Sequence, residues 1–360
     1  MKDNAIAISR AIAIICMVAG HSWIASPIEK AVNLFDMSLF YVVSGYCFNP
    51  GYISNPVAFL KKRISGLWFP YVKWGVISVL LHNIFLNLGI YSVDSLGIPI
   101  TVWGVTEIIK KILGCFVFGE GPDGFLGGYW FLKDMFFAVM LAYFSLVIAK
   151  GITKKATMGG VILLVLSVIK SYSNVSIPYI HTSTILSSSI FIVGYVIKQQ
   201  NIVMTIARSR YRFTLFLLAI ILLLFGYQLA PLSMSQLNIE VCDTSFVFPF
   251  FLYSTVTSIS ILTILVMFRE VLNRIEITRF AIYIGNNTLT ILTFHMLAFK
   301  SVNYLLCKCY TLESYTIGLF PTNLDYAAQG WWVVYTVIGV VVPISYKYIL
   351  DKLFNKKTYV

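Results

Sequence analysis

The chain of 360 residues is 58% hydrophobic and only 12% charged, and its mean hydropathy is +0.82. A soluble domain usually carries about a quarter charged residues, so this composition excludes a water-soluble globular protein and indicates one that lies largely in lipid. The net charge of +12 would suit nucleic acid, but the basic residues form short clusters between apolar runs, a pattern that fixes membrane topology. We therefore expect membrane lipids as partners and no nucleic acid.

Ten apolar runs of spanning length follow one another along the chain. They lie near 5–25, 33–49, 67–90, 129–149, 157–171, 183–197, 213–230, 244–267, 281–301 and 331–350. The second, fifth and sixth are short and need tilt or local thinning of the bilayer. A shorter stretch at 112–128 is expected to be re-entrant or interfacial. The sequence thus predicts an all-α polytopic membrane protein with about ten transmembrane helices, folded as a single domain over 1–360.

The distribution of Lys and Arg predicts the orientation of these helices. With the N-terminus inside, the inner loops carry about three times as many basic residues as the outer loops. Both termini are therefore expected on the cytoplasmic side. The six cysteines show neither a disulfide framework nor a metal-ligand spacing, so no metal is expected.

Two ionisable residues, Arg10 and His21, lie inside the first run. Their spacing of eleven residues is three helical turns plus about 20°, so they share one face about 16 Å apart along the axis. An ionisable residue within a span marks a functional site by default, which favours a polar stripe that faces a cavity. The alternative is that Arg10 snorkels to the headgroups and His21 caps the helix.

Further polar residues occur in the later runs. Asp36 enters the second run from the side on which His21 lies and would orient its imidazole, although a solvated residue at a helix N-terminus is equally compatible. Ser44 precedes Gly45 in mid-run, which allows the close approach of a backbone or a ligand. His295 lies at a depth like that of His21, so the two histidines would line one cavity, unless His295 is a hydrogen-bonded structural residue.

The basic cluster Lys61–Arg63 precedes the third run. It is compatible with a topology signal, with a site for anionic lipid, or with a grip on the phosphates of a nucleotide-containing donor. Trp130 opens the fourth run, where aromatic residues usually form an interfacial belt.

Taken together and in order, these segments resemble the membrane acyltransferase-3 family. The matching segments are Ser9-Arg10…Gly20-His21-Ser22, Met37-Ser38-Leu39-Phe40…Ser44-Gly45-Tyr46, Pro70-Tyr71, Trp130-Phe131-Leu132 and Gly285-Asn286…His295. The subgroup that resembles fucose and sugar O-acetylases is nearest. Two departures are Ser38 in place of the family's proline, and Ser65-Gly66 where relatives often carry a second arginine.

The resemblance implies an acyl-CoA-dependent O-acetyltransferase that moves an acetyl group from cytoplasmic acetyl-CoA to a hydroxyl of a surface or secreted glycan or glycolipid. It implies His21 as the catalytic histidine, Arg10 as the essential arginine and Lys62 with Arg63 as ligands of the CoA phosphates. Asp36 is expected to assist His21. The residues expected to line the site are Ser44, Tyr46, Trp130, Asn286 and His295.

His21 would act as a general base or through a transient acyl-histidine. A polysaccharide exporter or transporter without acyl transfer is the alternative function, because it would also enclose polar residues within a helix bundle. A structural or regulatory scaffold is the third possible function. The expected location is a cell membrane, in a bacterium the cytoplasmic (inner) one. The acceptor, the acyl group and the oligomeric state stay open.

Overall fold

The computed structural model describes residues 4–93, 98–119, 124–173, 175–214, 216–218, 220–221, 233–238 and 244–354. These residues form helices and contain no β-strand. The α-helices are α1 Asn4–His21, α2 Ser26–Asn33, α3 Asp36–Tyr46, α4 Pro56–Arg63, α5 Phe69–Asn87, α6 Val105–Phe116, α7 Trp130–Ile148, α8 Thr153–Tyr172, α9 Thr182–Gln199, α10 Ile202–Arg208, α12 Val247–Met267, α13 Arg269–Leu272, α14 Glu276–Asn286, α15 Thr288–Tyr310, α16 Leu324–Tyr326 and α17 Trp332–Leu353.

Within the described residues, seven helical segments are long and apolar enough to cross a membrane. They are Asn4–His21, Pro56–Asn87, Gly124–Ile148, Thr153–Tyr172, Val247–Met267, Thr288–Tyr310 and Leu324–Leu353. The pair α9 and α10, bent by 60°, passes the same test together and brings the number to eight. The chain is therefore an all-α, multi-pass integral membrane protein, and the expected number of ten spans stays a prediction.

Three of the expected spans differ from their runs. The second run forms α3, an 11-residue helix of about 16 Å, which is too short to cross a bilayer core of about 30 Å. The ninth run is divided, because α14 ends at Asn286 and α15 begins at Thr288. Most of the seventh run, 213–230, lies outside the described residues.

The basic cluster Lys61–Arg63 lies in a helix and not in a loop. A continuous segment of 32 residues runs from α4 through the π-helical turn η2 (Ile64–Trp68) into α5. Pro70 follows just after this turn, at the start of α5. Single π-helical turns are frequent at functional sites, and this one carries Gly66.

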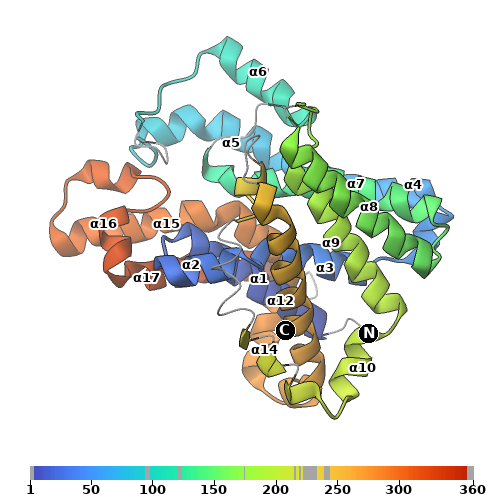
Figure 1. Ribbon diagram of the computed structural model, residues 1–360. Coiled ribbons are helices and arrows are strands. Elements are labelled where there is room, and N and C mark those ends of the chain that lie inside the picture. Colours follow the sequence, from blue (N-terminus) through green and yellow to red (C-terminus); the bar gives the residue numbers. More distant parts are fainter. Residues whose placement is uncertain are drawn as a thin grey trace.

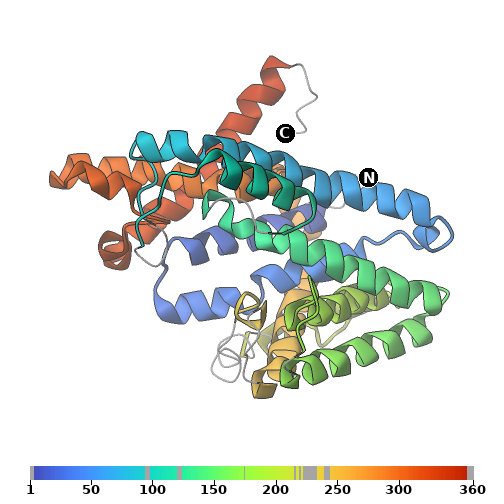
Figure 2. The ribbon, with the colours of Figure 1, turned by 90° about the horizontal axis from the view of Figure 1, so that it is seen from above.

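Helix α1 lies at the centre of the molecule and packs against α3, α12, α14, α15 and α17. Figure 2 shows it between the group α7–α9 and the group α15 and α17. Small residues permit this packing: a Cβ added at Gly285 of α14 would lie 1.7 Å from the carbonyl oxygen of Ala7. The two backbones are therefore in contact, which fixes α1 relative to α14.

Helices α3 and α9 cross just as closely (Figure 1). A Cβ at Gly45 would lie 1.9 Å from the carbonyl oxygen of Phe191, and a Cβ at Gly194 would lie 2.1 Å from that of Val42. The close approach expected at Ser44-Gly45 is thus confirmed, and its partner is a helix backbone.

A buried carboxylate joins this crossing to α7. Asp134 accepts hydrogen bonds from Tyr41 Oη of α3 at 2.7 Å and from Ser183 Oγ and Thr184 Oγ1 of α9 at 3.0 and 2.6 Å. Charge-assisted hydrogen bonds are stronger than neutral ones, so the three helices hold a common position. Trp130 opens α7 one turn before Asp134, and its location follows from this junction.

The segment around 112–128 lies beside α5. Helix α6 packs on α5. Just before α6 begins, the backbone N–H of Trp103 donates a hydrogen bond to Asn83 Oδ1 of α5. At the end of α6, the carbonyl oxygen of Phe116 accepts a hydrogen bond from Trp68 Nε1 at 3.0 Å. The chain then reaches Trp130 through a 3-10 turn, Gly124–Tyr129. The twelve residues of α6 are too few to cross a membrane.

Candidate functional site

The centre of the candidate site is a pair of histidines from α1 and α15. His21 is the last residue of α1, and its Nδ1 lies 2.8 Å from Nε2 of His295, which is fully buried. The other ring nitrogen of His295, Nδ1, lies 3.0 Å from the carbonyl oxygen of Ile291 and 3.1 Å from that of Leu292. The two histidines are in contact, but the expectation that both line one cavity is met by His21 alone, because His295 is not among the residues that line the cavity described below.

A glycine gives the pair its room. A Cβ at Gly128 would lie 2.9 Å from Leu292 Cδ1 and 3.8 Å from Cε1 of both His21 and His295. Any larger residue at this position would clash with Leu292 and contact both rings.

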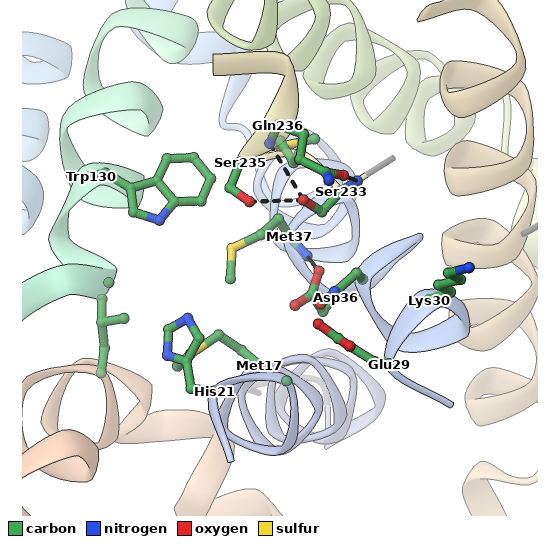
Figure 3. Close-up of a pocket in the computed structure, with 15 residues that line it drawn as sticks. Met17, His21, Glu29, Lys30, Asp36, Met37, Trp130, Ser233, Ser235 and Gln236 are labelled. Atoms are coloured by element: carbon green, nitrogen blue, oxygen red, sulfur yellow. Dashed lines mark hydrogen bonds between the residues drawn. The ribbon is translucent and has the colours of Figure 1, made fainter. Parts of the chain in front are cut away.

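His21 faces a polar cavity of about 460 Å³. In Figure 3 its imidazole points into this cavity, across from Trp130 and Met37. We call this space the polar cavity; its side-chain lining is Met17, His21, Glu29, Lys30, Asn33, Asp36, Met37, Trp130, Ser233, Met234, Ser235, Gln236 and Leu292. An indole face beside several hydroxyl, amide and carboxylate groups suits a polyhydroxylated ligand.

A second, smaller cavity of about 180 Å³ is lined by Arg10. We call it the apolar cavity, since Arg10, Ser44 and Thr288 are the only polar side chains among its described lining residues. Met17, Met37 and Leu292 line both cavities, so they lie at their common boundary. The two cavities together follow one face of α1, with Arg10 at one end and His21 at the other, as the spacing predicts.

The guanidinium of Arg10 is incompletely satisfied. Its Nε is buried and has no hydrogen-bond partner in the described part of the chain. Leaving a buried charged donor without an acceptor is costly. The arginine is therefore better suited to an anionic or carbonyl-bearing ligand than to holding the fold together.

The carboxylates of the polar cavity differ in their surroundings. Asp36 is buried, and its Oδ1 accepts a hydrogen bond from the backbone N–H of Met37 at 2.6 Å. Glu29 lies on α2, and burial raises the pKa of its carboxyl above the usual value. A hydrogen bond with Asn33 and the positive charge of Lys30 lower this pKa and so offset part of the effect of burial. Asp36 shares the cavity with His21, but the hydrogen-bond partner of His21 Nδ1 is His295.

Five residues expected at the site are absent from the lining of both cavities: Lys62, Arg63, Tyr46, Asn286 and His295. Lys62 is exposed on α4, and Arg63 places its guanidinium 5.3 Å from the ring centre of Phe59. Tyr46 carries Lys198 on its ring at 4.6 Å, and Asn286 is exposed at the end of α14. Lys62 and Arg63 are each about one helical turn from Gly66, which lines the apolar cavity.

Other lining residues had not been expected from the sequence. Glu29 and Asn33 of α2, one helical turn apart, reach the polar cavity, and their spacing could have indicated a common face. Ser233, Ser235 and Gln236 come from a short segment without hydrophobic periodicity, and no sequence signal points to them.

Within the described residues, no group of three or more His, Cys, Asp and Glu side chains is arranged to hold a metal ion. The arrangement offers an imidazole in the polar cavity, about one helical turn from Met17, which also lines the apolar cavity. Such a group can take a proton from a hydroxyl on one side while an acyl group approaches from the other.

Comparison with known proteins adds an independent finding. A family model described as an acyltransferase domain matches residues 3–348, nearly the whole chain. No curated protein and no solved structure matches the chain. Since the match includes α1, α15 and both cavities between them, the chain belongs to the membrane acyltransferase-3 family.

Proposed function

We propose that this acyltransferase transfers an acetyl group from acetyl-CoA to a hydroxyl of a surface or secreted glycan, with His21 as the general base. The observation that carries the proposal is the position of His21 in the polar cavity, next to three residues that also line the apolar cavity. A sugar in the polar cavity and a thioester in the apolar cavity would meet at the boundary that these three residues form.

The donor would enter at the Arg10 end. The CoA phosphates are too polar for the membrane interior and would stay at the cytoplasmic mouth, where Lys62, Arg63 and Arg10 supply positive charge. The apolar cavity, lined by residues such as Ile14 and Phe131, suits the extended pantetheine arm and its thioester. Orientation of this mouth toward the cytoplasm follows the expected topology with the N-terminus inside.

The acceptor would occupy the polar cavity. Sugars present hydroxyl groups to carboxylates and amides and pack their apolar faces on aromatic rings, and the lining offers Asp36, Gln236 and Trp130 for these contacts. This composition supports a glycan acceptor.

The reaction then balances as follows. His21 takes the proton of the sugar hydroxyl, and the oxygen attacks the thioester carbonyl carbon to form the new C–O bond. The C–S bond breaks, and the CoA thiolate leaves with the proton that His21 returns. General-base catalysis of this kind contributes about 10²–10⁴-fold to the rate.

The test is acetyl transfer by the purified protein, reconstituted in lipid nanodiscs with labelled acetyl-CoA and a panel of oligosaccharides. His21→Ala should lower the transfer rate at least about 100-fold. His181→Ala removes a histidine that caps α9 outside both cavities and should stay near the wild-type rate. Equal transfer by His21→Ala and wild type would overturn the catalytic assignment, and no transfer by wild type to any acceptor would overturn the proposed function.

A further inference from the structure

The hydrogen bonds around His295 determine which of its nitrogens carries a proton. Its Nδ1 lies 3.0 Å from the carbonyl oxygen of Ile291 and 3.1 Å from that of Leu292. Carbonyl oxygens only accept hydrogen bonds, so Nδ1 must be the donor. The ring is fully buried, and in the described part of the chain neither histidine ring forms an ion pair. Burial without a counter-charge favours the neutral imidazole, and its Nε2 is therefore an acceptor.

The proton on His21 follows from this. Its Nδ1 lies 2.8 Å from Nε2 of His295, and a hydrogen bond between them needs a hydrogen on His21 Nδ1. A neutral imidazole carries a single ring proton, so Nε2 of His21 keeps its lone pair.

The geometry of the two rings agrees with a hydrogen bond in their planes. The ring centres are 5.1 Å apart and the planes meet at 22°. The distance of 5.1 Å equals the N···N distance of 2.8 Å plus one ring radius on each side, so the nitrogens lie on the line between the centres. The rings thus meet edge to edge and nearly coplanar, the direction in which an N–H and a lone pair point.

His295 cannot easily turn away from this position. Phe299 lies against its ring edge-on at a centroid distance of 5.7 Å, and Leu292 and Gly128 lie beside the pair. The two carbonyl oxygens belong to the same helix as His295, so the ring is oriented by its own backbone.

We propose that His295 is a positioning residue that holds His21 in the tautomer protonated at Nδ1, so that Nε2 is the atom that receives the hydroxyl proton. This role rests on the proposed function of His21 and replaces the expected role of His295 as a substrate contact. When His21 becomes an imidazolium, its Nδ1–H continues to donate to the neutral His295. An orienting partner of a catalytic histidine acts in the same way in hydrolase triads, where loss of the correct tautomer lowers kcat by about 10⁴.

A matched pair of substitutions separates this role from packing. His295→Gln places an amide oxygen near the former Nε2 and keeps an acceptor for His21, whereas His295→Leu fills a similar space without one. With reconstituted protein, His295→Leu should lower kcat about 100-fold and leave KM for acetyl-CoA and for the acceptor within about twofold. His295→Gln should recover kcat to within about tenfold of wild type. Equal kcat for the two variants, or a loss that appears in KM, would refute the positioning role.

The tautomer itself can be observed without any turnover. The chain has four histidines, so ¹⁵N NMR of protein labelled at the histidine rings, with His21→Ala for assignment, can resolve His21. In wild type its Nδ1 should be protonated and its Nε2 bare, and His295→Leu should shift the population toward the other tautomer. A wild-type His21 protonated at Nε2 would overturn the proposal. This measurement also decides the matter if wild type transfers no acetyl group, in which case only the proposed function fails.

Discussion

Arg10 illustrates how a residue can be unfavourable for the fold and still have a clear place in it. Its buried Nε has no partner, and its side chain lines the apolar cavity. An apolar side chain here would remove this cost, because a buried donor without a hydrogen-bond partner destabilises the fold.

The Arg10→Met variant tests this interpretation. We expect KM for acetyl-CoA to rise at least about tenfold, a loss of about 1.4 kcal/mol in binding, while the melting temperature stays equal or increases. Steady-state kinetics and thermal unfolding in the same nanodiscs provide both values. Lys154→Met, which removes an exposed charge at the start of α8, serves as the control. A lower melting temperature with an unchanged KM would make Arg10 a structural residue.

At the residue level the sequence predicts the ionisable residues of the site better than the residues that line the rest of the two cavities. Arg10 and His21 follow from helical spacing within one apolar run, and His295 follows from its similar depth. Trp130, Asp36 and Ser44 also line the cavities as expected. Gln236 and its neighbours could not be predicted, because a short polar segment without periodicity does not reveal which helices it will cover.

At the level of single elements, the π-helical turn η2 connects the basic cluster to the apolar cavity. Gly66 lies in this turn and lines the cavity, and a Cβ added there would meet no atom within 4 Å. The position therefore has room for a larger side chain, and that side chain would occupy the space proposed for the pantetheine arm.

Filling this space should impair donor binding without harming the fold. For Gly66→Leu we expect KM for acetyl-CoA to rise about tenfold, with an unchanged melting temperature, since leucine favours helices more than glycine does. Gly66→Ala adds only the Cβ and should bind the donor as wild type does. If the leucine variant kept the wild-type KM in the same kinetic assay, the apolar cavity would not be the donor path.

Element boundaries could be predicted from the sequence only in part. The end of α3 at Tyr46 agrees with Pro50 shortly after it, since a proline disfavours helix in the residue before it. The division of the ninth run was not expected, because average hydropathy does not respond to a single break. Asn287, with non-helical φ and ψ of −121° and 27°, separates α14 from α15.

For the whole molecule, composition is enough to predict the class of protein. It is not enough to predict the number of membrane crossings. A high hydrophobic fraction admits few alternatives to an α-helical membrane protein. The count depends on bent and interrupted segments such as α9 and α10, whose path is decided by tertiary packing.

Two exposed cysteines provide a direct test of the expected topology. Cys47 lies three residues after Ser44, which lines the apolar cavity together with Arg10, so it should face the cytoplasm in the expected topology. Cys309 lies at the far end of α15 and should face outward. In cells with a variant that keeps only Cys309, a membrane-impermeant maleimide should label the protein. A variant that keeps only Cys47 should react after permeabilisation alone. The reverse pattern would invert the orientation and place the Arg10 end outside.

The boundary formed by Met17, Met37 and Leu292 has a bearing on the physiology of the membrane. In the expected topology, the apolar cavity opens toward the cytoplasm and the polar cavity toward the outside, so this layer of side chains separates two aqueous compartments. Methionine is flexible and fills irregular gaps, which would let the layer yield to a thioester and close again behind it. In the proposed reaction, an acetyl group would then cross this layer without opening a continuous aqueous path between the two cavities.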